Sequence, residues 1–190
     1  MVSKLLLAVE EIVLGCDDDA ITAQLLRRYR DIQAGLGFNK SPEAYGAFPT
    51  DPYSHTPKGQ GARQPGMTGL VKEEIIARKG ELCLTIEDGC LVFNPKLFDT
   101  SELLKAPSTY EYVDVTGHHK SIYLPANTLA YTCCQTPIVL QTGRKDQIKV
   151  TTSEAQEVRV PGARVDSEIS RHIFLRDGQV EKLWVQLKVD

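Results

Sequence analysis

The strongest constraint on the fold is a change in the spacing of apolar residues near residue 80. Before this point, apolar residues recur every three or four positions, which is the period of one face of an α-helix. After it, apolar and polar residues alternate, as they do in a strand with one buried face. The sequence therefore predicts an α+β protein with a helical segment at residues 1–80 and a β domain at residues 81–190.

Three helices are expected in the helical segment. The first is expected at about residues 2–15, where apolar residues follow helical spacing. The second follows a run of three aspartates that begins at Asp17, because acidic residues suit a helix N-terminus, and it extends to about residue 36. The third is expected at about residues 67–79, with Gly80 as its cap.

The helical pattern is lost at residues 37–65, which are rich in proline, glycine and aromatic residues. A connection of this length is uncommon inside a compact domain and more often has a function than serves only as a connector. Disordered segments are usually poor in aromatic residues. We therefore expect an ordered loop that lies against a surface.

The β domain is expected to consist of short strands joined by tight turns. Asp88-Gly89 between two apolar runs is a strong signal for a two-residue hairpin. Further strands are expected at residues 110–115, 121–124, 129–132, 138–141, 147–151, 157–160, 168–175 and 180–189, the last two paired as a hairpin. Many short strands at regular spacing favour an antiparallel β-sandwich.

The charge balance argues against nucleic-acid binding as the main function. The chain has 22 Lys and Arg against 25 Asp and Glu, a net charge of −3, and no basic cluster. Membrane insertion is not expected either. The longest apolar run near the start, residues 5–9, is far shorter than the roughly 20 residues that a spanning helix needs.

The cysteines indicate a reducing compartment. Five cysteines, an odd number without a Cys-x-x-Cys pair, argue against a disulfide framework, so we expect a cytoplasmic protein. No metal site is expected, because His118 and His119 at a hairpin tip have no further ligands nearby in the sequence. No cofactor is expected, because the sequence contains no nucleotide- or dinucleotide-binding motif.

A candidate anion site lies at the start of the third expected helix. Backbone N–H groups at a helix N-terminus are unpaired and have a partial positive charge, which suits phosphate. Gly69 lets a ligand approach the backbone, Thr68 adds a hydroxyl and Arg63 adds a counter-charge. The alternative is that Thr68 caps the helix and Arg63 is solvated.

The long loop supplies a candidate sugar-binding surface. Asp51, Tyr53 and His55 alternate, so an extended segment would direct all three side chains to one side. With Tyr45 and Phe48, they offer aromatic faces for a sugar ring and polar groups for its hydroxyls. The alternative is that Asp51 forms an Asx turn and His55 bonds a loop carbonyl.

Glu73 and Glu74 in the third helix do not form a paired acid and base. Adjacent helical residues diverge by about 100°, so only one of the two carboxylates could face a pocket. Pairs of this kind are most often surface charge. An independent hydrolase would need a general acid and a general base, and no convincing pair is found.

Several segments follow one another in a characteristic order: Met67-Thr68-Gly69 at a helix start, a helix at residues 71–79, and then the hairpin at residues 81–95. This order resembles the carboxyl end of the (α/α)6-toroid sugar enzymes, the cellobiose phosphorylase-like glycoside phosphorylases and their hydrolase relatives. The resemblance covers about residues 1–105. It implies that the helices are the end of a toroid, that a β-sandwich follows, and that Thr68 and Gly69 contact inorganic phosphate.

The resemblance does not extend to a complete enzyme. The toroid needs far more helices than the three expected here, and no residue of this chain matches the general-acid Asp of the family. The resemblance therefore implies the carboxyl-terminal part of a larger enzyme, and the isolated chain should not turn over substrate.

Two functional hypotheses follow. In the first, the chain forms one wall of a sugar and phosphate site in a carbohydrate-active enzyme, and its apolar helix faces pack against the rest of that enzyme or against a second copy. In the second, the chain is a self-contained, non-catalytic β-sandwich that binds a ligand or a protein partner. The second hypothesis requires Leu5, Val9, Leu25 and Ile32 to be buried within the monomer.

Overall fold

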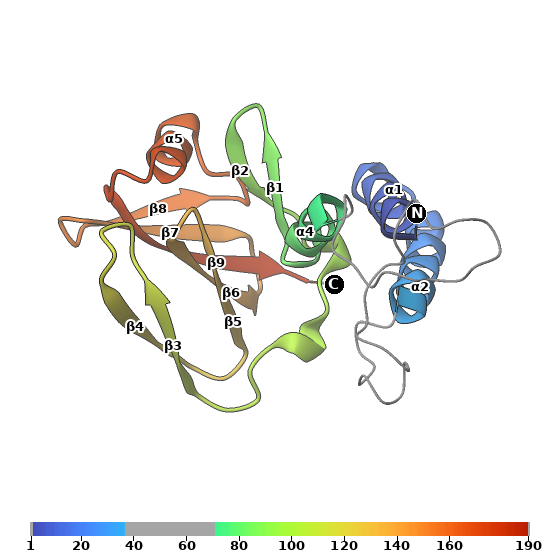
Figure 1. Ribbon diagram of the computed structural model, residues 1–190, viewed down its shortest axis with the longest axis horizontal. Coiled ribbons are helices and arrows are strands. Elements are labelled where there is room, and N and C mark those ends of the chain that lie inside the picture. The colour runs from blue at the N-terminus through green and yellow to red at the C-terminus, as the bar shows by residue number, and fades with distance from the viewer. Residues whose placement is uncertain (1, 37–70, 190) are drawn as a thin grey trace. The chain divides into compact units, whose positions relative to one another are not determined.

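A computed structural model describes residues 2–36 and 71–189 (Figure 1). The chain divides into two compact units, Met1–Leu82 and Cys83–Asp190. The described part of the first unit is helical, and the second contains all the described strands and one further α-helix. The predicted α+β class is confirmed.

Three helices form the described part of the first unit: α1 (Val2–Gly15), α2 (Asp19–Leu36) and α4 (Val71–Glu81). The predictions for α1 and α2 are confirmed. The N-terminus of α2 is capped by Asp18, whose Oδ1 accepts a hydrogen bond of 2.9 Å from the backbone N–H of Ile21. Of the third predicted helix, residues 67–70 lie outside the described residues.

Gly80 does not end the third helix, as the sequence predicted, because α4 continues through it to Glu81. A Cβ atom at position 80 would overlap the carboxylate oxygen Oε1 of Glu10 in α1. Glycine is needed here because it lets the α4 backbone approach this side chain closely.

The second unit is built on a five-stranded sheet with the strand order β5-β6-β9-β7-β8. Its strands are β5 (Thr128–Cys133), β6 (Thr136–Gly143), β7 (Gln147–Thr152), β8 (Glu157–Pro161) and β9 (Val180–Lys188). Two hairpins precede it, β1 (Leu84–Glu87) with β2 (Cys90–Phe93), and β3 (Ser108–Val113) with β4 (His119–Leu124). Two short 3-10 helices, Pro95–Leu97 and Thr100–Glu102, connect the hairpins. The hairpin predicted at Asp88-Gly89 is confirmed.

The strand predicted at residues 168–175 is wrong, because this segment is the helix α5 (Ser167–Leu175). Ile169 and Ile173 lie four residues apart and so share one face of a helix. Asp166 caps its start, since Oδ1 of Asp166 accepts a 2.8 Å hydrogen bond from the N–H of Ile169. Arg176 ends the helix in the left-handed conformation with φ of 55°.

The helix α5 changes the topology of the sheet. The last hairpin was expected to pair residues 168–175 with residues 180–189. It does not form, because the first of these segments is the helix α5. Strand β9 instead lies between β6 and β7, parallel to β6 and antiparallel to β7 (Figure 1). The sheet is therefore mixed, and the prediction of an entirely antiparallel arrangement is wrong. The predicted sandwich is not confirmed.

One face of the five-stranded sheet forms the core of the second unit. Leu183, Val185 and Leu187 of β9 are buried on this face, as their alternation predicted. They belong to an apolar cluster that includes Leu91 and Phe93 of β2 and Ile173 of α5. The hairpin β1–β2 and the helix α5 thus cover the apolar face, and the intervening residues of each strand point to the opposite face.

Candidate ligand-binding site

The sites predicted in the long loop and at the start of the third helix lie outside the described residues. These are the sugar-binding candidates Tyr45, Phe48, Asp51, Tyr53 and His55, and the anion-binding candidates Arg63, Thr68 and Gly69. Their roles stay predictions.

Glu73 and Glu74 lie in the described part of α4. Glu73 is buried, so the expectation of surface charge is wrong for this residue. Glu74 is partly buried and lines a pocket of about 320 Å³ together with Arg78 and Glu81. His118 and His119 are both exposed. Across residues 2–36 and 71–189, no group of three or more His, Cys, Asp and Glu side chains is arranged to hold a metal ion.

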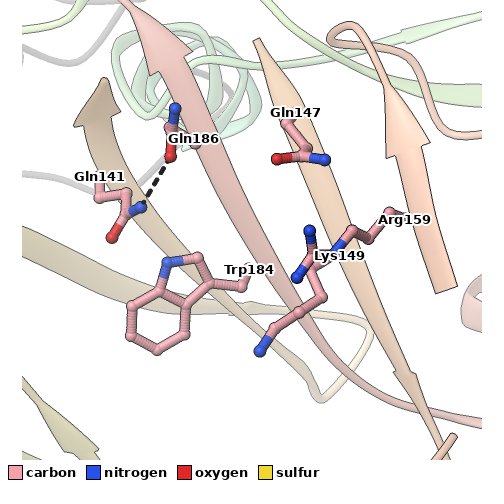
Figure 2. Close-up of a pocket in the computed structure, with 6 residues that line it drawn as sticks. All are labelled: Gln141, Gln147, Lys149, Arg159, Trp184 and Gln186. Atoms are coloured by element: carbon pink, nitrogen blue, oxygen red, sulfur yellow. Dashed lines mark hydrogen bonds between the residues drawn. The ribbon is translucent and has the colours of Figure 1, made fainter. Parts of the chain in front are cut away.

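The polar face of the five-stranded sheet contains a hollow of about 300 Å³. Three glutamines, two cations and one tryptophan line it (Figure 2): Gln141, Gln147, Gln186, Lys149, Arg159 and Trp184. They come from four strands, β6, β7, β8 and β9. Figure 2 shows the indole ring on one side of the hollow and the two cations on the other.

The strand register arranges these six side chains in two rows. In the first row, Trp184 lies opposite Lys149, which lies opposite Arg159. In the second row, Gln186 lies between Gln141 and Gln147 on the neighbouring strands. The rows are two residues apart along each strand, and all six side chains therefore project from the same face.

The glutamine row is partly held in place. Nε2 of Gln141 donates to Oε1 of Gln186 at 3.2 Å, and Nε2 of Gln186 donates to the carbonyl oxygen of Lys145 at 3.1 Å. Gly143 leaves room for this arrangement, because a Cβ atom there would overlap the Gln186 side chain. The Gln147 side chain makes no hydrogen bond within the described part of the chain. Its carboxamide therefore has both donors and acceptors free for a ligand.

The two cations differ in their partners. Nζ of Lys149 lies 2.8 Å from Oε1 of Glu157, and this contact lowers the pKa of the Glu157 carboxyl. Arg159 makes no ion pair with any described residue. Lys149 and Arg159 lie directly opposite each other on β7 and β8 and form a like-charge pair, whose repulsion the Glu157 carboxylate offsets only in part.

A second polar cluster is buried among the three helices of the first unit. The Tyr29 hydroxyl lies 2.6 Å from Oε1 of Glu81 and 3.1 Å from Oε2 of Glu10. Glu81 also accepts hydrogen bonds from Gln33, at 2.7 Å, and from Arg78, at 2.8 Å. Burial of the Glu10 carboxyl raises its pKa to about 8.

The number of hydrogen-bond donors in this cluster shows which of its carboxyl groups is protonated. A phenol has one proton, so Tyr29 donates to only one of its two carboxyl neighbours. The shorter contact and the paired Arg78 identify Glu81 as the ionised acceptor. Glu10 is then the protonated member and donates to the Tyr29 oxygen. The three side chains thus hold the helices α1, α2 and α4 together, and their polar groups hydrogen-bond to one another.

A third cluster lies at the turn of the β3–β4 hairpin. Oδ1 of Asp114 accepts hydrogen bonds from the N–H and hydroxyl of Thr116, at 2.8 and 2.6 Å, and from the N–H of His118, at 3.0 Å. These bonds lower the pKa of the Asp114 carboxyl. Lys120 joins Asp114, at 3.3 Å, to Glu181, at 3.2 Å. The polar groups of this cluster therefore shape the turn.

Sequence reasoning missed the hollow on the sheet. Its residues are spread from position 141 to position 186, and no local motif joins them. The available signal was the alternation of Lys182, Trp184 and Gln186 with the apolar residues of β9. That pattern predicts a polar face but not which strands lie beside it.

No family model and no curated protein matches this chain. Among the described residues, no helix is long and apolar enough to cross a membrane. The function therefore has to be inferred from the chemistry of the site.

Proposed function

We propose that this chain binds a carbohydrate on the polar face of its five-stranded sheet and is part of a larger carbohydrate-active enzyme of the glycoside phosphorylase or hydrolase kind. The observation that supports this most directly is the placement of Trp184 beside a row of three glutamines. An indole ring stacks on the apolar face of a sugar ring, and carboxamides both donate to and accept from sugar hydroxyls.

The hollow is suited to binding and not to bond cleavage. Glycoside hydrolysis uses two carboxyl groups on opposite sides of the scissile bond. None of the six residues that line the hollow has a carboxyl group. We therefore assign no catalytic residue to it, and we expect the isolated chain to be inactive.

The residues of the long loop have a separate place in this proposal. Tyr45, Phe48, Asp51, Tyr53 and His55 would contribute one wall of the sugar site in the whole enzyme. Arg63, Thr68 and Gly69 would bind phosphate beside it. These assignments rest on the resemblance and on the residue types alone.

The exposed apolar residues of the helices support a larger assembly. Leu5 is 53% exposed and Ile12 is 57% exposed, and both belong to α1. Val9, Leu25 and Ile32 are only partly buried. A self-contained module requires these residues to be buried, so we favour helices that pack against the rest of the enzyme or a second copy.

A self-contained, non-catalytic binding module is the second candidate. The second unit favours it, because this unit is compact and has an apolar cluster formed from its own strands and α5. All five cysteines are free. We also propose that the protein is located in a reducing compartment such as the cytoplasm. This location fits either candidate.

Titration of the full chain with three neutral oligosaccharides and one acidic oligosaccharide tests carbohydrate binding. Trp184 is the sole tryptophan, so its fluorescence reports on the hollow directly. We expect a saturable change with at least one of cellohexaose, xylohexaose, maltohexaose and oligogalacturonate. In calorimetric titrations, Trp184→Ala should weaken that binding by about tenfold or more, the scale of a lost aromatic contact. Trp184→Phe should keep part of it.

The matched control is Tyr123→Ala, which removes an exposed aromatic side chain from β4, outside the hollow. It should leave the affinity unchanged. If these four ligands and a sulfated oligosaccharide all leave the fluorescence unchanged at millimolar concentration, the hollow is not a carbohydrate site and the proposal is wrong.

A further inference from the structure

The charges on the polar face of the sheet restrict the kind of carbohydrate that fits there. Lys149, Arg159 and Lys182 all lie close enough to Glu157 to lower the pKa of its carboxyl. In the strand register, Lys149 lies opposite Arg159, and Lys182 and Glu157 lie on the two sides of Thr151. These three cations therefore share this part of the sheet with one carboxylate. The whole chain has a net charge of −3, so the excess of positive charge on this face is local.

Arg159 is the cation that is free to bind a ligand. Lys149 is paired with Glu157 at 2.8 Å, whereas Arg159 makes no ion pair within residues 2–36 and 71–189. Its guanidinium lines the hollow. A guanidinium offers two parallel N–H groups that match a carboxylate or another planar pair of oxygens. A ligand anion at this position would also offset the repulsion between Arg159 and Lys149.

The spacing of the first row fits a sugar chain. Arg159 and Trp184 are on β8 and β9, with β7 between them. Two strand spacings separate their backbone positions by roughly 10 Å. A disaccharide spans such a distance, so one ring on Trp184 places an acidic group of the next ring at Arg159. The three carboxamides of the second row then face the ring hydroxyls.

We infer that the hollow binds an acidic carbohydrate, with one sugar ring stacked on Trp184 and the anionic group of a neighbouring ring paired with Arg159. This inference rests on the proposed carbohydrate-binding function and adds the class of ligand. The shared chemistry is an anionic oxygen group, which a uronic acid supplies as a carboxylate and a sulfated sugar supplies as a sulfate ester.

The test compares acidic and neutral ligands of equal length on the full chain. The probes are oligogalacturonate, a sulfated oligosaccharide, cellohexaose and a single-stranded DNA oligomer, each titrated by calorimetry. We expect at least one of the two acidic oligosaccharides to bind about tenfold or more tightly than cellohexaose. Added salt should weaken this binding, because the charge contact is screened. Preference for either acidic source supports the inference and identifies the anionic group.

Arg159→Gln should weaken the binding of the acidic ligand far more than the binding of cellohexaose, and so remove most of the preference for the acidic ligand. Arg159→Lys should restore only part of the preference, because an ammonium lacks the planar pair of donors. Arg171→Gln is the matched control, since it removes the same charge from an exposed position on α5. This control should retain the full preference.

The outcomes separate the inference from the function on which it rests. If acidic and neutral oligosaccharides bind equally and Arg159→Gln changes neither, the acidic ligand is excluded while carbohydrate binding stands. If no oligosaccharide binds, both are wrong. DNA binding as tight as that of the acidic oligosaccharide, and dependent on Trp184, would overturn the assignment to carbohydrate.

Discussion

In the polar cluster of the helical unit, Glu10 is 2% exposed and Tyr29 is fully buried, so neither side chain has access to bulk water. A carboxyl group in such a place keeps its proton to higher pH, because ionisation would leave a charge in a poorly solvated position. The nearby Glu81 carboxylate also raises the pKa of Glu10, and Glu11 adds to this effect. At the residue scale, the helical unit therefore contains a group that titrates near neutral pH.

The raised pKa of Glu10 predicts a loss of stability at alkaline pH. Between its usual value of 4.5 and its folded value of about 8, the folded chain keeps a proton that the unfolded chain releases. The free energy of unfolding therefore falls as pH rises through this window. Glu10→Gln cannot ionise and keeps a donor for the Tyr29 oxygen. We expect this variant to be more stable than the native chain at pH 9 by roughly 2–4 kcal/mol.

Urea unfolding followed by far-ultraviolet circular dichroism at pH 5 and at pH 9 measures this difference. At pH 5 the two proteins should have nearly the same stability, because Glu10 is protonated in the native chain. Asp17→Asn is the control, since it removes an exposed carboxylate of the helical unit that does not act on the pKa of Glu10. Parallel pH profiles for Glu10→Gln and the native chain would contradict the protonation scheme.

At the scale of elements, α5 determines how the second unit is connected. Ser170 is fully buried and joins α5 to the β1–β2 hairpin. Its Oγ accepts a 3.1 Å hydrogen bond from the N–H of Leu91, and its hydroxyl lies 3.4 Å from the carbonyl oxygen of Val165. A buried N–H group without a hydrogen-bond partner lowers the stability of the folded state. The side chain of Ser170 therefore contributes to the stability of the second unit.

Ser170→Ala should destabilise the second unit by about 1–3 kcal/mol, because the Leu91 N–H loses its acceptor. Thermal or urea unfolding measures the change. Ser121→Ala, at an exposed position on β4, is the matched control and should change the stability by less than about 0.5 kcal/mol. Equal effects of the two substitutions would show that Ser170 does not bridge α5 and β2.

At the scale of the whole molecule, the helical unit exposes apolar residues on all three helices: Leu5 and Ile12 of α1, Ile21 of α2, and Ile75 and Ile76 of α4. Its interior also contains the charged and polar cluster of Glu10, Tyr29 and Glu81. The described helices thus leave several large apolar side chains exposed, which supports the proposal that they pack against further protein.

We expect the purified chain to bind an apolar dye and to self-associate in sedimentation experiments. Leu5 and Ile12 lie seven residues apart and so share one face of α1. Leu5→Gln combined with Ile12→Gln should reduce both the dye binding and the sedimenting mass. A compact native monomer that binds no dye would instead favour the self-contained module.

The local patterns of the chain predicted much of the fold. The helices α1 and α2, the turn at Asp88-Gly89 and the buried face of β9 follow from apolar period, caps and turn residues, which are properties of neighbouring residues. The segment at residues 168–175 is predicted as a strand, although it forms a helix. Its apolar residues at positions 169 and 173 and the cap at Asp166 are the local signals that identify a helix.

The α+β class, most of the elements and the separation of the helices at the start from the sheet that follows are predictable from the amino-acid sequence. The position of β9 between β6 and β7 is visible only in the folded chain. It places Trp184 in one row with Lys149 and Arg159, and Gln186 in one row with Gln141 and Gln147. Only the folded chain brings Glu10, Tyr29 and Glu81 together. The physical reason is that apolar period depends on neighbours along the chain, whereas a binding site depends on pairings between segments far apart in it.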